Sequence, residues 1–312
     1  MSENFLNRLD LYLEDVLRAE GLTDRDAAFL LKAIRNGKKL RARLFLGFAG
    51  GAGEQEMMAA ASIELFHYAT LVHDDIIDNA SMRRRGRPGP DGADTVSRVL
   101  LGDLLFSTGF SVLAGLEDER IWKEVNAALS GVIKGELLQQ ERKWDLGLTE
   151  EEYMGMIRLK TGSLFGGACK VASIMRSGHG PDALESEKFG ILLGTSYQIL
   201  DDCLDMAGSY TDKEAFKDAA NGIVTLPVIA FAREGGAGSR EMVDAVYAGD
   251  PAFRKERTEE LSSLLVSDGF LTKCLDRAER LLDEAALVTG KLPVAAVEVL
   301  EYMRGKIHEA KL

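Results

Sequence analysis

The sequence predicts an all-α protein, and three observations support that prediction. Only six prolines occur among 312 residues, and several of them fall where a helix would begin or a loop would run. Almost no segment alternates apolar and polar residues with a period of two, which is the pattern of a half-buried strand. Apolar residues instead recur every three or four positions, which is the spacing of an amphipathic helix.

The first expected helix lies near the amino terminus, and its apolar face must pack on another element. The apolar residues at helical spacing are Phe5, Leu9, Tyr12, Leu13, Val16 and Leu17. Thr23 marks the start of a second helix, because its hydroxyl can accept a hydrogen bond from a first-turn backbone N–H.

Further helix starts follow along the chain. Thr149 with Glu152 three residues later forms a capping box, and Pro293 marks a start near the carboxyl end. Between them lies another helical repeat, formed by Leu271, Leu275, Ala278, Leu282 and Ala285. The expected loops are short and cover 84–93, 176–181 and 234–238.

Length and composition leave one domain or two open. The chain is 46% hydrophobic, which is enough for a large core and too much for a disordered chain. A length of 312 residues allows two domains, and a single large helical domain is equally allowed. No segment has the composition of an interdomain linker.

Charge and cysteine usage exclude some classes of partner. The 50 acidic and 38 basic residues give a formal charge of −12, which repels nucleic-acid phosphates. Three cysteines without a CxxC pair indicate a reducing compartment, so we expect a cytoplasmic protein. The polar start lacks the apolar stretch of a signal peptide, and no window approaches the ~18 apolar residues of a membrane span, so no integral membrane segment is expected.

Two DDxxD motifs stand in the same apolar frame, LVHDDIID at 71–78 and ILDDCLD at 199–205. Their acidic residues are Asp74, Asp75 and Asp78 in the first motif and Asp201, Asp202 and Asp205 in the second. On a helix the first and last aspartates of each motif share a face, and the middle one lies roughly 100° around. Like charges one turn apart destabilise a helix unless a cation lies between them.

Oxygen ligands of this kind indicate Mg²⁺, which proteins hold with one or two carboxylates while phosphates and waters complete the shell. No His/Cys spacing indicates zinc. A single DDxxD could equally be a helix cap or a solvated acidic face. Two copies, 127 residues apart (201 minus 74), favour metal binding.

Basic residues near these motifs could bind a diphosphate, because arginine offers phosphate a planar fork and lysine a point charge. Each alone would be an ordinary surface charge. The candidates are Lys38, Arg41, Arg83, Arg84, Arg85, Lys160 and Lys213. His67, about two helical turns before Asp74, shares the face of the first acidic motif, although a lone histidine is commonly a core residue.

Together these motifs resemble, in order and over nearly the whole chain, the trans-type polyprenyl synthases. That family includes the farnesyl, geranylgeranyl and longer-chain diphosphate synthases. Residues 37–41 resemble its GKRxRP element, and 64–78 its first aspartate-rich motif. The later elements resembled are Gly102-Asp103, Gly135-Glu136 with Gln139, Lys160-Thr161 and 197–205.

The resemblance implies a single isoprenoid synthase-like helical bundle around a central cavity, with one domain over 1–312 and a homodimer. It implies a Mg²⁺-dependent prenyltransferase that condenses isopentenyl diphosphate with an allylic prenyl diphosphate. The implied metal ligands are Asp74, Asp78 and Asp201, supported by Asp75, Asp202 and Asp205. By the same resemblance, Arg83, Lys160 and Lys213 hold the allylic diphosphate; Lys38, Arg41, His67 and Arg84 hold isopentenyl diphosphate; Thr161 and Gln198 line the path of the allylic cation.

Residues before the first motif bear on product length. Thr70 and Ala69, four and five residues before Asp74, are small, and Phe66 lies one turn deeper. In the family an aromatic residue at those positions goes with short products. The resemblance therefore implies a product of geranylgeranyl length or longer.

Three positions depart from the family pattern: Ala42 replaces a proline, Arg85 is additional, and Gly222-Ile223 stands where Gly-Lys is expected. The missing lysine keeps open a non-catalytic subunit of a hetero-oligomeric synthase. A class I terpene cyclase shares the metal chemistry but needs no second diphosphate site. A helical protein with acidic surface patches would show no Mg²⁺-dependent diphosphate binding.

Overall fold

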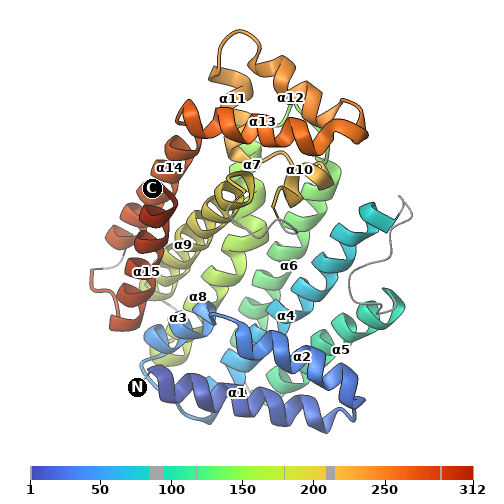
Figure 1. Cartoon of the computed structure of the whole chain (residues 1–312). Helices are drawn as coiled ribbons and strands as arrows, with labels where there is room; N and C mark the ends of the chain where they lie inside the picture. Colours follow the sequence, from blue (N-terminus) through green and yellow to red (C-terminus); the bar gives the residue numbers. More distant parts are fainter. Residues whose placement is uncertain are drawn as a thin grey trace. The chain divides into compact units, whose positions relative to one another are not determined.

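The computed structural model describes residues 2–83, 95–116, 118–178, 180–208, 215–288 and 290–311. In these ranges every regular element is a helix and no strand occurs, which confirms the all-α prediction (Figure 1). The helices are α1 (Ser2–Ala19), α2 (Asp24–Asn36), α3 (Leu40–Ala49), α4 (Glu54–Arg83), α5 (Thr95–Ala114), α6 (Glu119–Glu141), α7 (Glu150–Ile157), the π-helix η1 (Arg158–Gly162), α8 (Ser163–Ser177), α9 (Pro181–Met206), α10 (Lys217–Asn221), α11 (Leu226–Glu234), α12 (Ser239–Tyr247), the 3-10 helix η2 (Pro251–Phe253), α13 (Arg254–Ser267), α14 (Phe270–Val288) and α15 (Val294–Lys311).

The chain divides into two compact units. Unit 1 comprises Met1–Leu129, Gly166–Glu187 and Lys291–Val299. Unit 2 comprises Ser130–Phe165, Lys188–Gly290 and Leu300–Leu312. The expectation of one domain over 1–312 stays a prediction.

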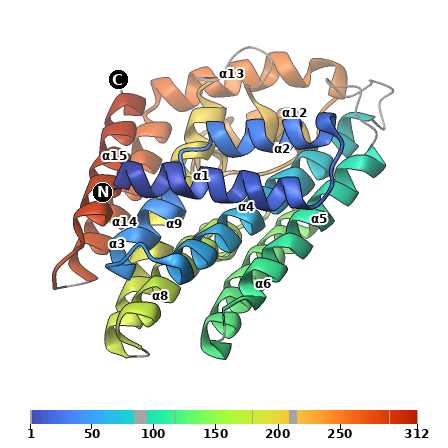
Figure 2. The ribbon, with the colours of Figure 1, turned by 90° about the horizontal axis from the view of Figure 1, so that it is seen from below.

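Unit 1 is organised around α4, on which α1, α3 and α5 pack; Figure 2 shows α4 and α5 side by side. The predicted apolar face of α1 is buried at Phe5, Leu9, Leu13 and Leu17. Truncating one such leucine to alanine would cost about 2–5 kcal/mol, because the cavity left behind relaxes only in part.

The predicted helix starts are confirmed by their caps. Thr23 accepts a hydrogen bond from Asp26 N at 3.2 Å, and α2 begins at the next residue. Thr149 accepts from Glu152 N at 3.3 Å while Glu152 accepts from Thr149 N at 3.0 Å, the reciprocal pair of a capping box.

The loops predicted at 176–181 and 234–238 separate α8 from α9 and α11 from α12, as expected. The loop predicted at 84–93 falls outside the described residues.

One described helix, α5, is long and apolar enough to cross a membrane by length and composition alone, with a mean hydropathy of 1.4 over 18 residues. The expectation that no window approaches a membrane span is wrong by this measure. Leu101, Leu105 and Leu113 of α5 are buried in unit 1, where α5 packs on α4. A core helix has the same composition, so the finding is weak evidence for a membrane span.

Candidate active site

The first aspartate motif lies on α4, as predicted. Asp75 is exposed to solvent and Asp74 is partly exposed. Asp78 and Arg83 lie on the same helix, but their side chains are outside the described set.

Two predicted diphosphate-binding residues, Arg84 and Lys213, fall outside the described ranges. Their proposed roles therefore stay predictions.

Next to Asp74, the ring of His73 is held against α5. Its Nε2 lies 3.3 Å from the carbonyl oxygen of Val99 and 3.4 Å from Oδ1 of Asp103. A Cβ at Gly102 would stand 2.2 Å from the same nitrogen, so only glycine permits this approach. His73 was not among the predicted site residues; its sequence signature is the glycine of Gly102-Asp103, which permits the close approach of the ring.

Arg41 and His67, both predicted to hold isopentenyl diphosphate, interact electrostatically in unit 1. Burial and then the Arg41 guanidinium lower the pKa of His67 well below its usual value, which keeps the ring neutral at pH 7. Burial raises the pKa of Glu64, and Arg41 opposes that shift. Glu64 also accepts a hydrogen bond from Ala42 N at 3.1 Å, which holds the carboxylate at the start of α3.

Between α2 and α3, two neighbouring lysines have different surroundings. Lys38 is exposed, as a substrate-binding residue requires. Lys39 adopts a left-handed backbone conformation (φ 50°), is buried, and pairs with Asp10 at 2.9 Å. Lys39 is therefore structural.

The three residues predicted to set product length differ in burial. Phe66 and Ala69 are fully buried, whereas Thr70 is partly exposed and donates a hydrogen bond to the carbonyl of His67 at 2.7 Å. The Phe66 ring faces α5, with its centroid 4.8 Å from that of Phe110 and 6.1 Å from that of Phe106. Their role in chain length stays a prediction.

In the second motif, on α9, the three aspartates have different surroundings. Asp201 is exposed, whereas Asp202 and Asp205 are buried. Asp205 accepts the backbone N–H groups of Lys217 at 3.0 Å and Asp218 at 3.2 Å at the start of α10. In this motif Asp201 is thus the aspartate exposed to solvent. Asp205 instead anchors the first residues of α10 to α9 through these two hydrogen bonds.

Asp202 has two protein donors, one on each carboxylate oxygen. The Tyr153 hydroxyl donates to Oδ2 at 2.5 Å, and Gln198 Nε2 donates to Oδ1 at 2.8 Å. Burial raises the pKa of Asp202 to about 7, and these two hydrogen bonds oppose the shift. Tyr153 was not among the predicted site residues, because it lies 49 residues away from Asp202 in the chain.

Lys160 and Thr161 lie on the single π-helical turn η1. Lys160 Nζ pairs with Oε2 of Glu136 at 2.7 Å, and the Thr161 hydroxyl donates to Gln198 Oε1 at 2.5 Å. Single π-helical turns within α-helices are frequent at functional sites. The predicted pair Thr161 and Gln198 is in direct contact.

Asp218 is a further acidic residue that the sequence analysis did not select. Its pKa is raised well above the usual value, first by burial and then by the charges of Asp202 and Asp205. No motif in the sequence marks Asp218 as a site residue.

Ile223, the departure from the family pattern, is buried. Tyr247 donates a hydrogen bond to its carbonyl at 3.0 Å, and Trp144 N donates to the carbonyl of Gly222 at 2.7 Å. Gly222 has φ 79°, and a Cβ there would overlap the Trp144 ring. An apolar side chain suits this packed position.

No group of three or more His, Cys, Asp or Glu side chains in the described ranges is arranged to hold a metal ion by itself. Mg²⁺ does not require such a group, since one or two carboxylates suffice when phosphates and waters supply the remaining oxygens. Each of the two aspartate motifs has solvent-exposed carboxylates of this kind, Asp74 and Asp75 in unit 1 and Asp201 in unit 2.

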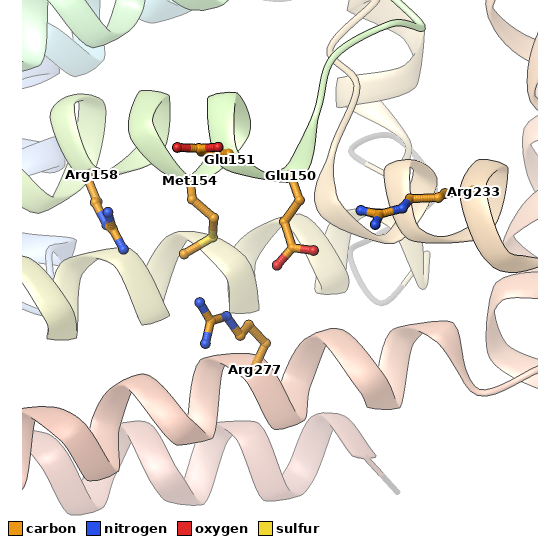
Figure 3. Close-up of a pocket in the computed structure, with 6 residues that line it drawn as sticks. All are labelled: Glu150, Glu151, Met154, Arg158, Arg233 and Arg277. Atoms are coloured by element: carbon orange, nitrogen blue, oxygen red, sulfur yellow. The ribbon is translucent and has the colours of Figure 1, made fainter.

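A surface pocket of about 350 Å³ in unit 2 contains none of the predicted site residues. Its lining residues are Glu150, Glu151, Met154, Arg158, Arg233 and Arg277. Figure 3 shows Arg158 and Met154 extending toward α14, and Arg277 extending from α14 toward them. Its mixed charges give no apolar channel for a prenyl chain.

Comparisons with known proteins identify the family. The polyprenyl synthetase family matches residues 27–264, more than half of the chain. The octaprenyl diphosphate synthase of Escherichia coli (strain K12) is 29% identical over 263 residues, covering 82% of this chain and 80% of that protein. The chain belongs to the polyprenyl synthetase family.

Solved structures agree with this membership. A decaprenyl diphosphate synthase from Rhodobacter capsulatus superposes with a TM-score of 0.82 at 27% identity, with both chains fully covered. A polyprenyl synthase from Caulobacter crescentus CB15, complexed with calcium and isoprenyl diphosphate, gives 0.81 at 24% identity over 100% of this chain and 94% of that one. The predicted isoprenoid synthase-like fold and the enzyme class, a trans-type prenyltransferase, are confirmed.

Proposed function

We propose that this prenyltransferase uses Mg²⁺ to condense isopentenyl diphosphate with an allylic prenyl diphosphate. The observation that carries the proposal is that the three aspartates of the second motif differ in burial and in hydrogen bonding. Asp201 is exposed to solvent, while Asp202 and Asp205 are buried and accept hydrogen bonds from the protein. An exposed carboxylate on a rigid support is what a metal–diphosphate complex needs.

Asp74, Asp78 and Asp201 are the proposed metal ligands, with Asp75, Asp202 and Asp205 in support. Bound Mg²⁺ supplies positive charge that stabilises the departing diphosphate. Two sets of basic residues complete the diphosphate sites. The allylic diphosphate is held by Arg83, Lys160 and Lys213, and isopentenyl diphosphate by Lys38, Arg41, His67 and Arg84. The neutral state of His67 suits a hydrogen-bonding rather than a charged role.

The allylic cation forms beside Thr161 and Gln198, whose side-chain oxygens offer partial negative charge without acting as nucleophiles. Isopentenyl diphosphate then attacks C1 of the allylic cation, and a proton leaves the new cation. No general base stands out in the sequence, so the released diphosphate takes that proton.

The product is of geranylgeranyl length or longer. Small Ala69 and Thr70 leave room for a growing chain, and the relatives named above carry the names octaprenyl and decaprenyl diphosphate synthase.

A cytoplasmic homodimer is the proposed assembly. Cys169, Cys203 and Cys274 are free thiols, as in a reducing compartment. The start of α5 carries an exposed apolar group formed by Val96, Val99 and Leu100. Exposed apolar groups of this kind are typical of subunit interfaces.

The deciding experiment incubates purified protein with labelled isopentenyl diphosphate, several allylic primers and Mg²⁺, and identifies products by mass spectrometry. Elongated products are expected with Mg²⁺ and none with EDTA. Turnover of the allylic substrate without isopentenyl diphosphate would indicate a terpene cyclase. No turnover with any primer would indicate a non-catalytic subunit.

A matched pair of variants tests the metal site. Asp201→Asn should lower kcat by at least about 10²-fold, since removing one preorganised charge-stabilising group costs that much in other enzymes. Asp15→Asn, at an exposed aspartate on α1, should leave kcat unchanged.

A further inference from the structure

Tyr153 and Asp202 form a buried pair within unit 2. Tyr153, on α7, is 1% exposed, and its hydroxyl donates to Oδ2 of Asp202 at 2.5 Å. Because the ring is enclosed on all sides, the hydroxyl has a fixed position. It therefore fixes the plane of the Asp202 carboxylate.

The other carboxylate oxygen, Oδ1, accepts a hydrogen bond from Gln198 Nε2 at 2.8 Å. In its ionised form the Asp202 carboxylate only accepts, so the Gln198 amide then turns its nitrogen toward Asp202, as the Nε2–Oδ1 contact of 2.8 Å has it. Its oxygen then points the opposite way, where the Thr161 hydroxyl donates to it at 2.5 Å. Four side chains thus form one hydrogen-bonded series from Tyr153 to Thr161.

Amide orientation matters for the chemistry beside Thr161. The amide oxygen is the negative end of the side-chain dipole and the NH₂ group is the positive end. A developing cation is stabilised by the oxygen and destabilised by the NH₂ group, so a reversed amide would raise the barrier to ionisation. The hydrogen bond from Gln198 to ionised Asp202 excludes the reversed amide.

We infer that Tyr153 is a positioning residue for prenyl transfer. Through Asp202 it holds the Gln198 amide with its oxygen on the Thr161 side, where the allylic cation passes. The inference rests on the proposed function, which assigns Thr161 and Gln198 to the cation path. Tyr153 itself touches no substrate.

Tyr153→Phe is the direct test, since it keeps the buried ring and removes only the hydroxyl. We expect kcat to fall about tenfold, the effect of losing a hydrogen bond to a charged group, with KM for both substrates within twofold of wild type. Tyr247→Phe is the matched control. Tyr247 is also buried in unit 2, but its hydroxyl donates to the Ile223 carbonyl and lies outside the series.

A double-mutant cycle separates positioning from general destabilisation. In a Gln198→Ala background, Tyr153→Phe should change kcat by less than twofold, because the amide it orients is gone. An equal tenfold loss in both backgrounds would overturn the inference. So would wild-type kcat in Tyr153→Phe, or the same loss in Tyr247→Phe.

The proposed function stands or falls separately, on whether the wild-type protein elongates an allylic primer. The cycle compares variants only after that activity is measured. Wild-type elongation with an additive cycle would leave the proposed function intact and remove the role of Tyr153. Wild-type protein without elongation would remove both.

Discussion

Gly135 of α6 lies so close to Lys160 of η1 that a Cβ on the glycine would stand 2.2 Å from the Lys160 backbone nitrogen. Backbone cannot move aside as a flexible side chain can. The next residue, Glu136, pairs with Lys160 Nζ at 2.7 Å. Gly135 and Glu136 thus fix the positions of both the backbone and the ammonium group of Lys160, a proposed diphosphate-binding residue.

Gly135→Ala should therefore destabilise the protein and impair catalysis. Overpacking at such a site costs about 1–3 kcal/mol, measured as the free energy of unfolding in urea. The displaced Lys160 should raise KM for the allylic substrate. Gly155→Ala is the control: no atom lies within 4 Å of its added Cβ, and alanine in a helix should stabilise by up to about 1 kcal/mol. Equal stability of the two variants would contradict the packing argument.

Asp202→Asn should change the pH dependence of stability. The folded-state pKa of about 7 lies above the unfolded value of 3.8, so protonated Asp202 favours the folded state. That contribution is complete below about pH 4 and is lost as the pH rises through about 7. Asparagine cannot ionise, so the free energy of unfolding of the variant has no such loss in this pH range.

The stability of the variant relative to wild type should rise by about 3 kcal/mol between pH 4.5 and 8. Urea unfolding in EDTA at several pH values measures this difference. Asp15→Asn, at an exposed position, should give a difference that does not vary with pH. If the difference in free energy of unfolding between Asp202→Asn and wild type did not vary with pH, the buried carboxylate would not be ionising in this range.

Ala69→Phe should shorten the product. Ala69 is fully buried on α4, one turn from Phe66, and an added ring there would fill space proposed for the prenyl chain. Mass spectrometry of the product ladder measures the effect. Ala172→Phe, at an equally buried alanine on α8, controls for simple overpacking and should lower stability without shifting the ladder. An unchanged ladder in Ala69→Phe would refute the channel assignment.

Leu100→Asp should shift the protein from dimer to monomer. Leu100 is 61% exposed and lies beside exposed Val96 and Val99, a group that a subunit interface would cover. Analytical ultracentrifugation measures the assembly. Leu287→Asp is the control, since Leu287 is 85% exposed and lies near the end of α14 rather than on α5. Identical sedimentation of both variants would place any interface elsewhere.

Sequence periodicity and caps predicted the helices well, because both signals are local. Thr23 and Thr149 cap the helices they were expected to cap. The π-helical turn at Lys160 could not be predicted in this way, since it accompanies the close approach of Gly135, 25 positions earlier in the chain.

The sequence allowed the residue types of the candidate site to be predicted. It did not show which of the aspartates would be buried and which exposed. A DDxxD motif on a helix gives three carboxylates at known angles, yet angles alone do not say which is buried. Asp205 is engaged by the start of α10, and Asp202 by Tyr153. Both contacts join residues distant in sequence, so only the folded chain separates them from Asp201.

All three native thiols are enclosed, and this makes the protein suitable for site-specific fluorescent labelling. Burial raises the pKa of Cys169, and a hydrogen bond with Cys274 followed by burial raises that of Cys203. Maleimides react with thiolates, so Cys169 and Cys203 stay inert at neutral pH, and Cys274 is only 2% exposed. A single cysteine introduced at exposed Leu184 would take the dye alone, with no native cysteine removed.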